Sequence, residues 1–578
     1  MNGFSTRWCG FTAISLLVVT VHAQPQLNPI SDLLAGDANL AGPGVRVRVT
    51  TSGTAYVTRM VAKTLTPEIA RAKMPFDPKP AVMDSLPTVT LSSMELLLFQ
   101  TPEISDVVPR TPDVVAVSMR DMNLSVSAIG SGHIDDVPLT GSVTIHTNRF
   151  HLDVHVQIKR NTRGNPSLRV ALCRAAANFP VMVTVQNSLT PESGARFADA
   201  VSRDGYKLFE NLLCPRIIYL VEKRINQRFG LLSSKIALGD LNNFDMVKSL
   251  LAAQDEFRRT IRRNKAIARD VPFPRRRFVT RPLTRVQRQS RLQTFIDSFN
   301  MSRADSLILD YGMMEAPLIS SRGIEIATSG EISRSGSRTP FGPHPISLPP
   351  PTSSAFLQVA VSDFVPNSLM YHGHRIGAFN TRVDPSTPQF GPVMRTTCDL
   401  TTGSLFCVGD LFPTLRDQNP GRGVAFMFST LKAPAVIVRP PEHGGIRFQL
   451  TGLIEVLSID ANGDTPVGSM EIYIDASMKM KMTSRIVRGR VSLETIKLTS
   501  RSPQVLVQEE LDDAGFLSRE ILQRIVNDIL KQGVPIPVHP LFRLQKPKLT
   551  LGDRAMLLET NFQLNQRLIQ QLTGERLV

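Results

Sequence analysis

Residues 150–159 read Phe150-His151-Leu152-Asp153-Val154-His155-Val156-Gln157-Ile158-Lys159, with an apolar side chain at every even position and a polar one at every odd position. Successive side chains of a β-strand point to opposite faces, so this period of two predicts a strand with one apolar face and one face in water. Leu139, Val143 and Ile145 continue the alternation upstream. Such strands are typical of antiparallel sheets, which commonly leave one face exposed to solvent.

The same alternation recurs in both halves of the chain. It predicts further strands at residues 46–49, 323–327, 446–450, 469–474 and 548–551. Apolar residues at helical spacing predict three helices, over residues 53–72, over 208–225, and from the N-cap candidate Ser518 to Gly533. Because strands predominate and the helices are few and long, the pattern indicates an α+β fold.

Residues 339–351 contain six prolines and separate two parts of comparable size. A Pro-rich run of this kind is a stiff, extended connector. Each part contains strands followed by a long helix and then more strands. We therefore expect two similar α+β domains, at residues 41–338 and 352–578, joined by this linker.

The N-terminus has the pattern of a cleaved secretory signal. Arg7 precedes an apolar run at residues 11–21, and small residues lead to a cleavage site after Ala23. The run is too short to span a bilayer, and no later stretch reaches the roughly 18 to 20 apolar residues of a membrane helix. We expect residues 1–23 to be removed and the protein to be secreted. A buried N-terminal helix is the alternative.

Four cysteines follow residue 23, namely Cys173, Cys214, Cys398 and Cys407. An even number in an exported protein predicts two disulfides. Residues 398–407 are symmetrical about Thr402-Gly403, so a two-residue hairpin would place Cys398 opposite Cys407, with Cα atoms about 4.5 Å apart. Cys173 and Cys214 must then pair with each other. A zinc site is the alternative, but the cysteines lack paired C-x-x-C spacing.

The positive charge of the chain is concentrated in one segment. The formal net charge is +16, but residues 258–291 hold thirteen Lys and Arg and one acid, which is +12. Without that segment and without Arg7, the rest of the chain carries only +3. We expect the insertion 241–303 to be a solvated, largely disordered segment. A basic amphipathic helix on an anionic membrane, or a heparin-like glycan site, is the alternative. The arginines that define this basic segment are Arg258, Arg259, Arg262, Arg263, Arg275, Arg276 and Arg277.

Several short segments together resemble the bactericidal/permeability-increasing protein family, which includes lipopolysaccharide-binding protein and the cholesteryl ester and phospholipid transfer proteins. The resemblance runs in order from Pro43 to Leu564, and no single motif in it is specific. It is carried by residues 43–50 before a helix, 72–75, the Cys173 to Cys214 spacing, 311–317, the proline linker, 361–364 and 535–537.

The resemblance implies a boomerang-shaped tubular fold, in which each half is a twisted, barrel-like antiparallel sheet wrapped on long helices and a central sheet joins the halves. It also implies an apolar pocket for the acyl chains of a phospholipid in each half, and no other cofactor. Our candidates for the lining of the first pocket are Val57, Met60, Val61 and Leu65; packing in the core is the alternative. Phospholipids or other lipids, and a lipoprotein or membrane surface, are the expected partners, and nucleic acid is not.

One stretch departs from the family pattern in a way that bears on function. Endotoxin-binding members resemble one another in a Lys-rich loop at the tip of the N-terminal barrel, but here residues 125–139 hold two Asp and no Lys or Arg. A loop of charge −2 repels an anionic lipid. We therefore expect lipid binding and transfer. The alternatives are an innate-defence protein that binds lipopolysaccharide and perturbs membranes, and a glycan-binding protein that uses the basic segment.

Enzymatic and metal sites have little support in the sequence. Nucleophile-elbow, His-Glu-x-x-His and phosphate-loop motifs are absent, so we expect no enzyme. His151 and His155 share a strand face with Asp153, but that face is the polar, outward one, so we expect no metal there. The sequons at Asn123 and Asn300 are candidates for glycosylation.

Overall fold

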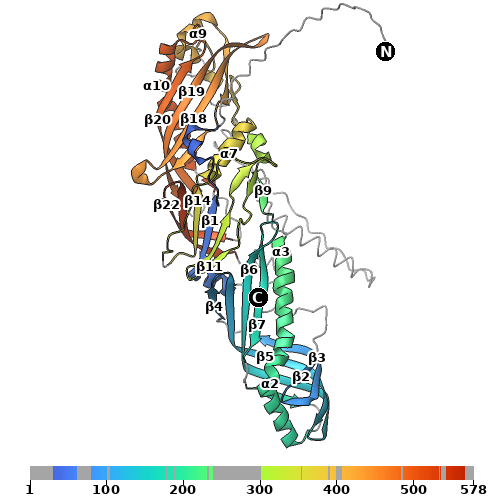
Figure 1. The fold of residues 1–578 in the computed structure, drawn as a ribbon. Helices are drawn as coiled ribbons and strands as arrows, with labels where there is room; N and C mark the ends of the chain where they lie inside the picture. Colours follow the sequence, from blue (N-terminus) through green and yellow to red (C-terminus); the bar gives the residue numbers. More distant parts are fainter. Residues whose placement is uncertain are drawn as a thin grey trace, which may run out of the picture.

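The computed structural model describes residues 30–60, 80–100, 105–176, 180–185, 189–230, 233–238, 301–352, 354–387, 391–398, 407–482, 486–532, 534–535 and 542–565. Figure 1 shows an elongated molecule with one lobe at each end and a sheet between them. The predicted signal peptide, residues 61–79, most of the insertion 241–303, and Asn300 lie outside the described residues.

The N-terminal lobe is a seven-stranded antiparallel sheet with a long helix against it (Figure 1). The strand order is β2-β3-β5-β6-β7, while β4 also pairs with β5 and β8 with β6. The strands are β2 (Ala81–Met83), β3 (Leu86–Gln100), β4 (Ser105–Arg110), β5 (Val114–Ile134), β6 (Val137–Arg160), β7 (Pro166–Ala175) and β8 (Met182–Val185). The helix is continuous through α2 (Pro191–Ile218), the π-helical turn η2 (Tyr219–Ile225) and α3 (Asn226–Gly230).

The C-terminal lobe repeats this plan with a second antiparallel sheet of seven strands and one long helix, α10 (Gln508–Gln532). Its strands are β15 (Thr381–Val383), β16 (Gly423–Thr430), β17 (Ala435–Val438), β18 (Ile446–Asp460), β19 (Gly463–Met482), β20 (Ile486–Ser500) and β21 (Val534–Pro535). The shorter helices of the C-terminal half are α7 (Phe364–Arg375), η4 (Gly391–Val393), α8 (Val408–Leu411), α9 (Pro413–Gln418) and η6 (Pro441–His443).

A six-stranded antiparallel sheet joins the two lobes, and strands from both halves of the sequence contribute to it (Figure 1). Its order is β11 (Leu318–Ser320), β12 (Gly323–Thr328), β1 (Val45–Thr50), β14 (Leu357–Ser362), β23 (Ala555–Leu564) and β22 (Phe542–Leu551). A small sheet beside it contains β13 (Glu331–Ser333), β10 (Ile308–Asp310) and β9 (Lys235–Ala237). The short helix η3 (Met301–Ser306) precedes β10, and η1 (Asp32–Asp37) precedes β1. This architecture confirms the predicted fold class.

The strands predicted from alternation all form, and two of the helix predictions need correction or extension. The predicted helix 208–225 is the second half of a helix that begins at the N-cap Thr190. The third helix begins ten residues before Ser518, which lies inside α10 and donates its hydroxyl to the Gly515 carbonyl at 3.2 Å. Acidic residues occupy the first turn of α10, where they interact favourably with the helix dipole.

Arg48 is buried, whereas the strand pattern of residues 46–49 predicts a solvated arginine. The proline linker covers this face of the central sheet, and Arg48 donates to the linker carbonyls of Leu348 at 3.2 Å and Pro349 at 2.6 Å. It also pairs with Glu325 at 2.9 Å and donates to Gln358 at 2.8 Å. The linker lacks regular secondary structure, as expected, but it is packed onto the sheet, with Ile346 and Leu348 buried and Pro349 and Pro350 exposed. The domain bounds beside it stay predictions.

A second buried network ties the N-terminal segment to the C-terminal half. Arg554, in the turn before β23, donates to Asp363 at 2.6 Å and to Asp37 at 2.6 Å, and His344 of the linker also contacts Asp37, at 2.9 Å. Only 6% of the Asp37 side chain and 1% of the Asp363 side chain are exposed. Burial raises the pKa of Asp363, although Arg554 acts in the opposite direction.

Candidate functional site

Helix α2 lies across the open side of the curled N-terminal sheet and fills the barrel with apolar side chains. It contacts β7 on one edge of that sheet and β2 and β3 on the other. Phe209 of α2 packs against Phe150 of β6 with ring centroids 4.9 Å apart, and both side chains are fully buried. The middle of this lobe is therefore a dry, closed core.

Polar side chains of the helix hold the edge strand β7. The Asn226 amide bonds both backbone groups of Leu168, accepting from its N–H at 2.8 Å and donating to its carbonyl at 2.8 Å. The carboxylate of Glu222 accepts from the N–H of Val170 at 2.9 Å. These contacts satisfy backbone groups that an unpaired edge would leave open.

The C-terminal lobe uses the same arrangement. Asn527 of α10 bonds both backbone groups of Val491 in β20, at 2.7 and 2.8 Å, and Gln523 accepts from the N–H of Leu493 at 2.8 Å. In both lobes the helix residues are four apart and the strand residues two apart. The two barrels are thus closed by matching contacts, which no sequence motif indicated.

The apolar side chains on the inner face of the N-terminal barrel become less buried toward the central sheet. Two rows of paired residues cross β5, β6 and β7 there. The first row is Val117, Val154 and Cys173, and the second is Val115, Val156 and Val170. All six are apolar, and Val156, Val170 and Cys173 pack against the closed core, but only Val154 is fully buried. We define these six residues as the inner apolar face, and they are the candidate site.

This face lies where the barrel meets the central sheet. The turn between β4 and β5 accepts a hydrogen bond at the Pro112 carbonyl from Ile319 of β11, at 2.9 Å. The turn between β6 and β7 accepts another at the Gly164 carbonyl from Met313, at 2.8 Å. Both contacts fix the rim of the barrel against the edge of the central sheet.

The sequence candidates Val57 and Met60 lie on a helix at residues 51–60, and both are half-buried. Tyr56 of this helix stacks on Phe356 at 5.3 Å and meets Phe562 edge-on at 5.7 Å. Val61 and Leu65 lie outside the described residues. The role of these four side chains in lining a pocket stays a prediction.

The stretch 125–139, predicted to be a loop at the barrel tip, forms the ends of β5 and β6 with a two-residue turn. Asp135 and Asp136 occupy this turn with φ of 48° and 65°, the left-handed conformation that tight hairpins require. Arg196 of α2 forms an ion pair with Asp135. The tip hairpin itself carries no cation, but a neighbouring helix offsets one of its two negative charges.

Both predicted cysteine pairs are disulfides in the structure. Cys173 of β7 joins Cys214 of α2 with Cα atoms 5.8 Å apart, and Cys398 joins Cys407 with Cα atoms 5.3 Å apart. Cys407 is also the N-cap of α8. The predicted hairpin turn at Thr402-Gly403 lies outside the described residues and stays a prediction.

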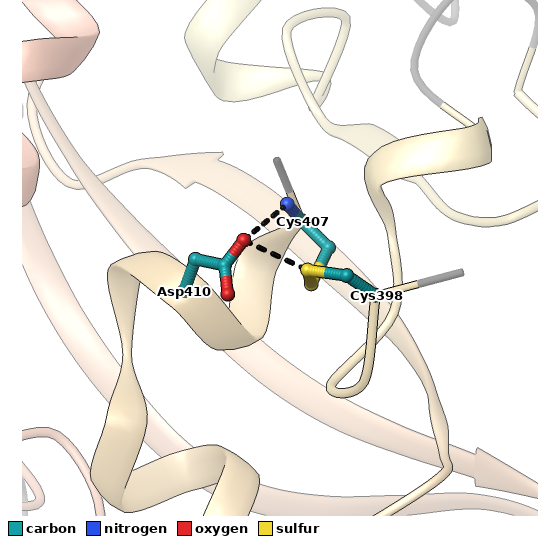
Figure 2. Close-up of side chains that lie close together, drawn as sticks. All are labelled: Cys398, Cys407 and Asp410. Carbon is teal, nitrogen blue, oxygen red and sulfur yellow. Dashed lines mark hydrogen bonds between the residues drawn. A yellow bond between two sulfur atoms is a disulfide. The ribbon is translucent and has the colours of Figure 1, made fainter. Parts of the chain in front are cut away.

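Asp410 faces the second disulfide (Figure 2). Its carboxylate accepts from the N–H of Cys407 at 3.2 Å and lies near the sulfur of Cys398. Among the described residues this is the one group with metal-ligand spacing. Oxidised sulfurs are not thiolates and do not serve as metal ligands, so the carboxylate caps the helix instead.

The remaining candidates do not converge on this site. Asn123 is half-buried in β5 and donates to Gln100 at 3.4 Å. His151 lies 4.0 Å from Asp121 across the bulge in β5. The basic segment lies outside the described residues. Within the described ranges, every helix is too short or too polar to cross a membrane.

Comparison with known proteins classifies the C-terminal half of the chain. Residues 301–564 match the C-terminal domain of the LBP / BPI / CETP family. A crystal structure of lipopolysaccharide binding protein is similar over 91% of this chain and 100% of that chain, with 15% sequence identity and a TM-score of 0.46. Takeout 1 of Epiphyas postvittana is similar over 32% of this chain and 95% of its own, at 12% identity and a TM-score of 0.25. P47 of Clostridium botulinum E1 is similar over 91% of this chain and 99% of its own, at 7% identity and a TM-score of 0.25. No curated protein sequence matches the chain.

Proposed function

We propose, from the premise that residues 301–564 make this chain a member of the LBP / BPI / CETP family, that it is a secreted lipid-binding and lipid-transfer protein. The observation that carries the proposal is the inner apolar face, where apolar side chains from three strands continue a dry core and are only partly covered. Partly covered apolar surface inside a barrel favours an apolar occupant.

The energetics of an acyl chain fit such a surface. Each CH₂ group that leaves water for an apolar surface gains about 0.8 kcal/mol, so ten of them gain about 8 kcal/mol. A free energy of about 8 kcal/mol corresponds to a dissociation constant near 1 μM before the costs of ordering are subtracted. The headgroup can stay at the rim, where the barrel meets the central sheet.

The tip hairpin supports transfer over endotoxin binding. Asp135 and Asp136 carry negative charge there, and Arg196 pairs with one of them. A surface without excess positive charge gives an anionic lipid A headgroup no electrostatic attraction. The defence and glycan-binding alternatives depend on the basic segment at residues 258–291.

Lipid extraction tests the binding proposal. We expect native mass spectrometry of the secreted protein to show bound lipid, and Val156→Glu to abolish it because a carboxylate on the inner apolar face is costly to desolvate. Gln157→Glu, one residue along β6 and on the other face, is the matched control and should keep its lipid. A folded Val156→Glu protein with the wild-type lipid content would contradict the proposal.

A transfer assay separates the proposed activity from the alternatives. We expect movement of fluorescent phospholipid between vesicles, and weak binding of lipopolysaccharide, with residues 258–291 present or deleted. Tight lipopolysaccharide binding without transfer would favour the defence role. Binding of heparin with no lipid in either assay would favour the glycan-binding role.

A further inference from the structure

The end of the hairpin formed by β19 and β20 carries four cations on its outer face. Lys479 lies directly opposite Arg490, and Lys481 lies directly opposite Arg488. All four side chains are exposed. Like charges directly opposite each other in a sheet are destabilising, so this arrangement costs stability and indicates a role other than folding.

The fold leaves these four residues, which we call the hairpin cations, without neutralising partners. Within the part of the chain that the structure describes, none of them forms an ion pair or a hydrogen bond. Two acids of the same strands are engaged elsewhere, since Asp475 accepts from Arg447 at 2.9 Å and Glu494 accepts from Ser477 at 2.8 Å. Opposed side chains lie about 5 Å apart and alternate ones about 7 Å, both within the Debye length of about 8 Å at physiological salt. The hairpin cations therefore act on a partner as one concentrated positive charge.

Closure of the C-terminal barrel does not require this part of the hairpin. The hydrogen bonds from α10 reach β20 at Val491, and beyond Val491 the hairpin continues through four more residue pairs. The matching contact in the N-terminal lobe is at Leu168, and only two pairs follow it. The first of those two pairs sets Lys159 opposite Ser167, so it holds one cation where the C-terminal hairpin holds two. The longer hairpin and its charge are thus particular to the C-terminal lobe.

The reverse face of the same hairpin is apolar and partly covered. Successive side chains of a strand point to opposite faces, so Met478, Met480 and Met482 alternate with the cations along β19. All three methionines are half-buried. β19 contacts β22 of the central sheet, which places this end of the C-terminal lobe at its junction with that sheet, as the inner apolar face is in the N-terminal lobe. A flexible apolar surface therefore lies directly behind the hairpin cations.

We propose that the hairpin cations dock the C-terminal lobe on the surface of an anionic phospholipid bilayer. This inference rests on the proposed lipid-transfer function and adds the kind of membrane and the surface that meets it. The cations form an array about as wide as it is long, which matches a plane of anionic headgroups, whereas a linear polyanion is matched by cations in a line. Each Lys or Arg near an anionic leaflet strengthens binding about fivefold. The apolar surface behind the array favours a lipid partner over a glycan.

The test places one tryptophan beside the hairpin cations. The sole Trp of the chain, Trp8, lies in the predicted signal peptide, so an introduced tryptophan reports alone. Ser492→Trp puts it at an exposed position of β20, two residues from Arg490 and on the same face. Vesicles of brominated phosphatidylcholine quench a tryptophan that touches them. We expect quenching when the vesicles contain phosphatidylserine, and at least a tenfold higher lipid requirement when they do not.

Matched variants isolate the position and the charge. The test variant combines Lys479→Gln, Lys481→Gln, Arg488→Gln and Arg490→Gln. It should need at least tenfold more anionic lipid for half-maximal quenching, and its melting temperature should equal or exceed that of wild type because repulsion is relieved. The control variant removes the same charge from exposed positions of β6, β7 and their turn, as Lys159→Gln, Arg163→Gln, Arg169→Gln and Arg174→Gln. It should be quenched as readily as the parent Ser492→Trp protein.

A second probe tests whether docking is local. Phe516 is 75% exposed on α10, eleven residues before the Asn527 that bonds Val491, so Phe516→Trp should stay unquenched. Equal quenching of both probes, or quenching of Ser492→Trp that survives neutralisation of the hairpin cations, would overturn the inference. Retention on heparin that depends on the hairpin cations, without quenching by vesicles, would also overturn it.

The proposed function is tested separately on neutral lipid. Phospholipid transfer between vesicles of phosphatidylcholine alone does not require an anionic surface, and we expect it in wild type and in the test variant. If that transfer occurs while the Ser492→Trp probe stays unquenched by anionic vesicles, the inference alone fails. If wild type neither transfers phospholipid nor carries lipid in native mass spectrometry, the proposed function fails together with the inference.

Discussion

Replacement of Arg554 by Met should destabilise the protein by about 3–5 kcal/mol at pH 7, because removing one partner of a buried ion pair leaves charge without compensation. Arg554 donates to Asp37 and Asp363, each at 2.6 Å, and their side chains are 6% and 1% exposed. Without Arg554, a carboxylate can take up a proton instead. For a group with an ordinary pKa of about 3.9, that uptake costs about 4 kcal/mol at pH 7 and about 1 kcal/mol at pH 4.5.

The sign of the pH dependence follows from the direction of the pKa change. Burial already raises the pKa of Asp363, and loss of Arg554 raises it further because the opposing charge is removed. A folded state that binds more protons than the unfolded state gains stability as the pH falls. The difference between wild type and Arg554→Met should therefore shrink from pH 7 to pH 4.5.

Urea denaturation followed by far-UV circular dichroism measures this difference, since the sole Trp of the chain, Trp8, lies in the predicted signal peptide. The triple variant Arg554→Met, Asp37→Asn, Asp363→Asn is the control and should recover most of the lost stability at pH 7. A loss below 1 kcal/mol for Arg554→Met, or a loss that is equal at both pH values, would refute the account of an uncompensated buried charge.

Three further predictions concern other parts of the structure. Burial raises the pKa of Tyr311 to about 12, and the charge of Asp310 adds to the effect. When wild type and Tyr311→Phe are titrated by absorbance, the variant should lack one phenol that ionises near pH 12. Its contribution to stability is present below pH 10 and is lost as the pH rises through 12. The difference in absorbance between the two proteins should show no phenol ionisation near pH 10; an ionisation near pH 10 in that difference would contradict the prediction. The double variant Cys173→Ser, Cys214→Ser opens a disulfide loop of 41 residues and should lower the free energy of unfolding by about 4 kcal/mol, measured by urea denaturation. An unchanged urea midpoint would show that this disulfide does not stabilise the fold. Asn226→Ala should speed hydrogen exchange at Leu168 by roughly five- to thirtyfold, through loss of about 1–2 kcal/mol, while exchange in the C-terminal lobe stays unchanged.

Local patterns in the sequence were sufficient to predict most of the secondary structure. The period of two in residues 150–159 predicts β6, because burial of one face imposes that period on a strand. Apolar residues at Leu208, Leu212 and Leu213 likewise predict the buried stripe of α2. The cysteine pairs were also predictable, whereas the role of Cys407 as the N-cap of α8 was not.

Features that depend on distant contacts could not be predicted. Arg48 has the pattern of a solvated residue, and only the linker, about 300 residues later, buries it. The partly covered rows around Val156 depend on strand register, which alternation alone does not determine.

The position of β1 has a consequence for how the chain folds during synthesis. Among the described strands it is made first, yet it lies in the middle of the central sheet between β12 and β14, and Arg48 bonds Gln358 across 310 residues. At 5–20 residues per second, the ribosome needs roughly 15–60 s to deliver β14 after β1 has been made. The other partner of β1, β12, is made only shortly before β14, so for most of that time both edges of β1 are unpaired. Unpaired edges favour pairing with other chains, which makes transient protection by a chaperone advantageous. A nascent chain arrested before residue 357 should accordingly aggregate more readily than one arrested after β14 has left the ribosome.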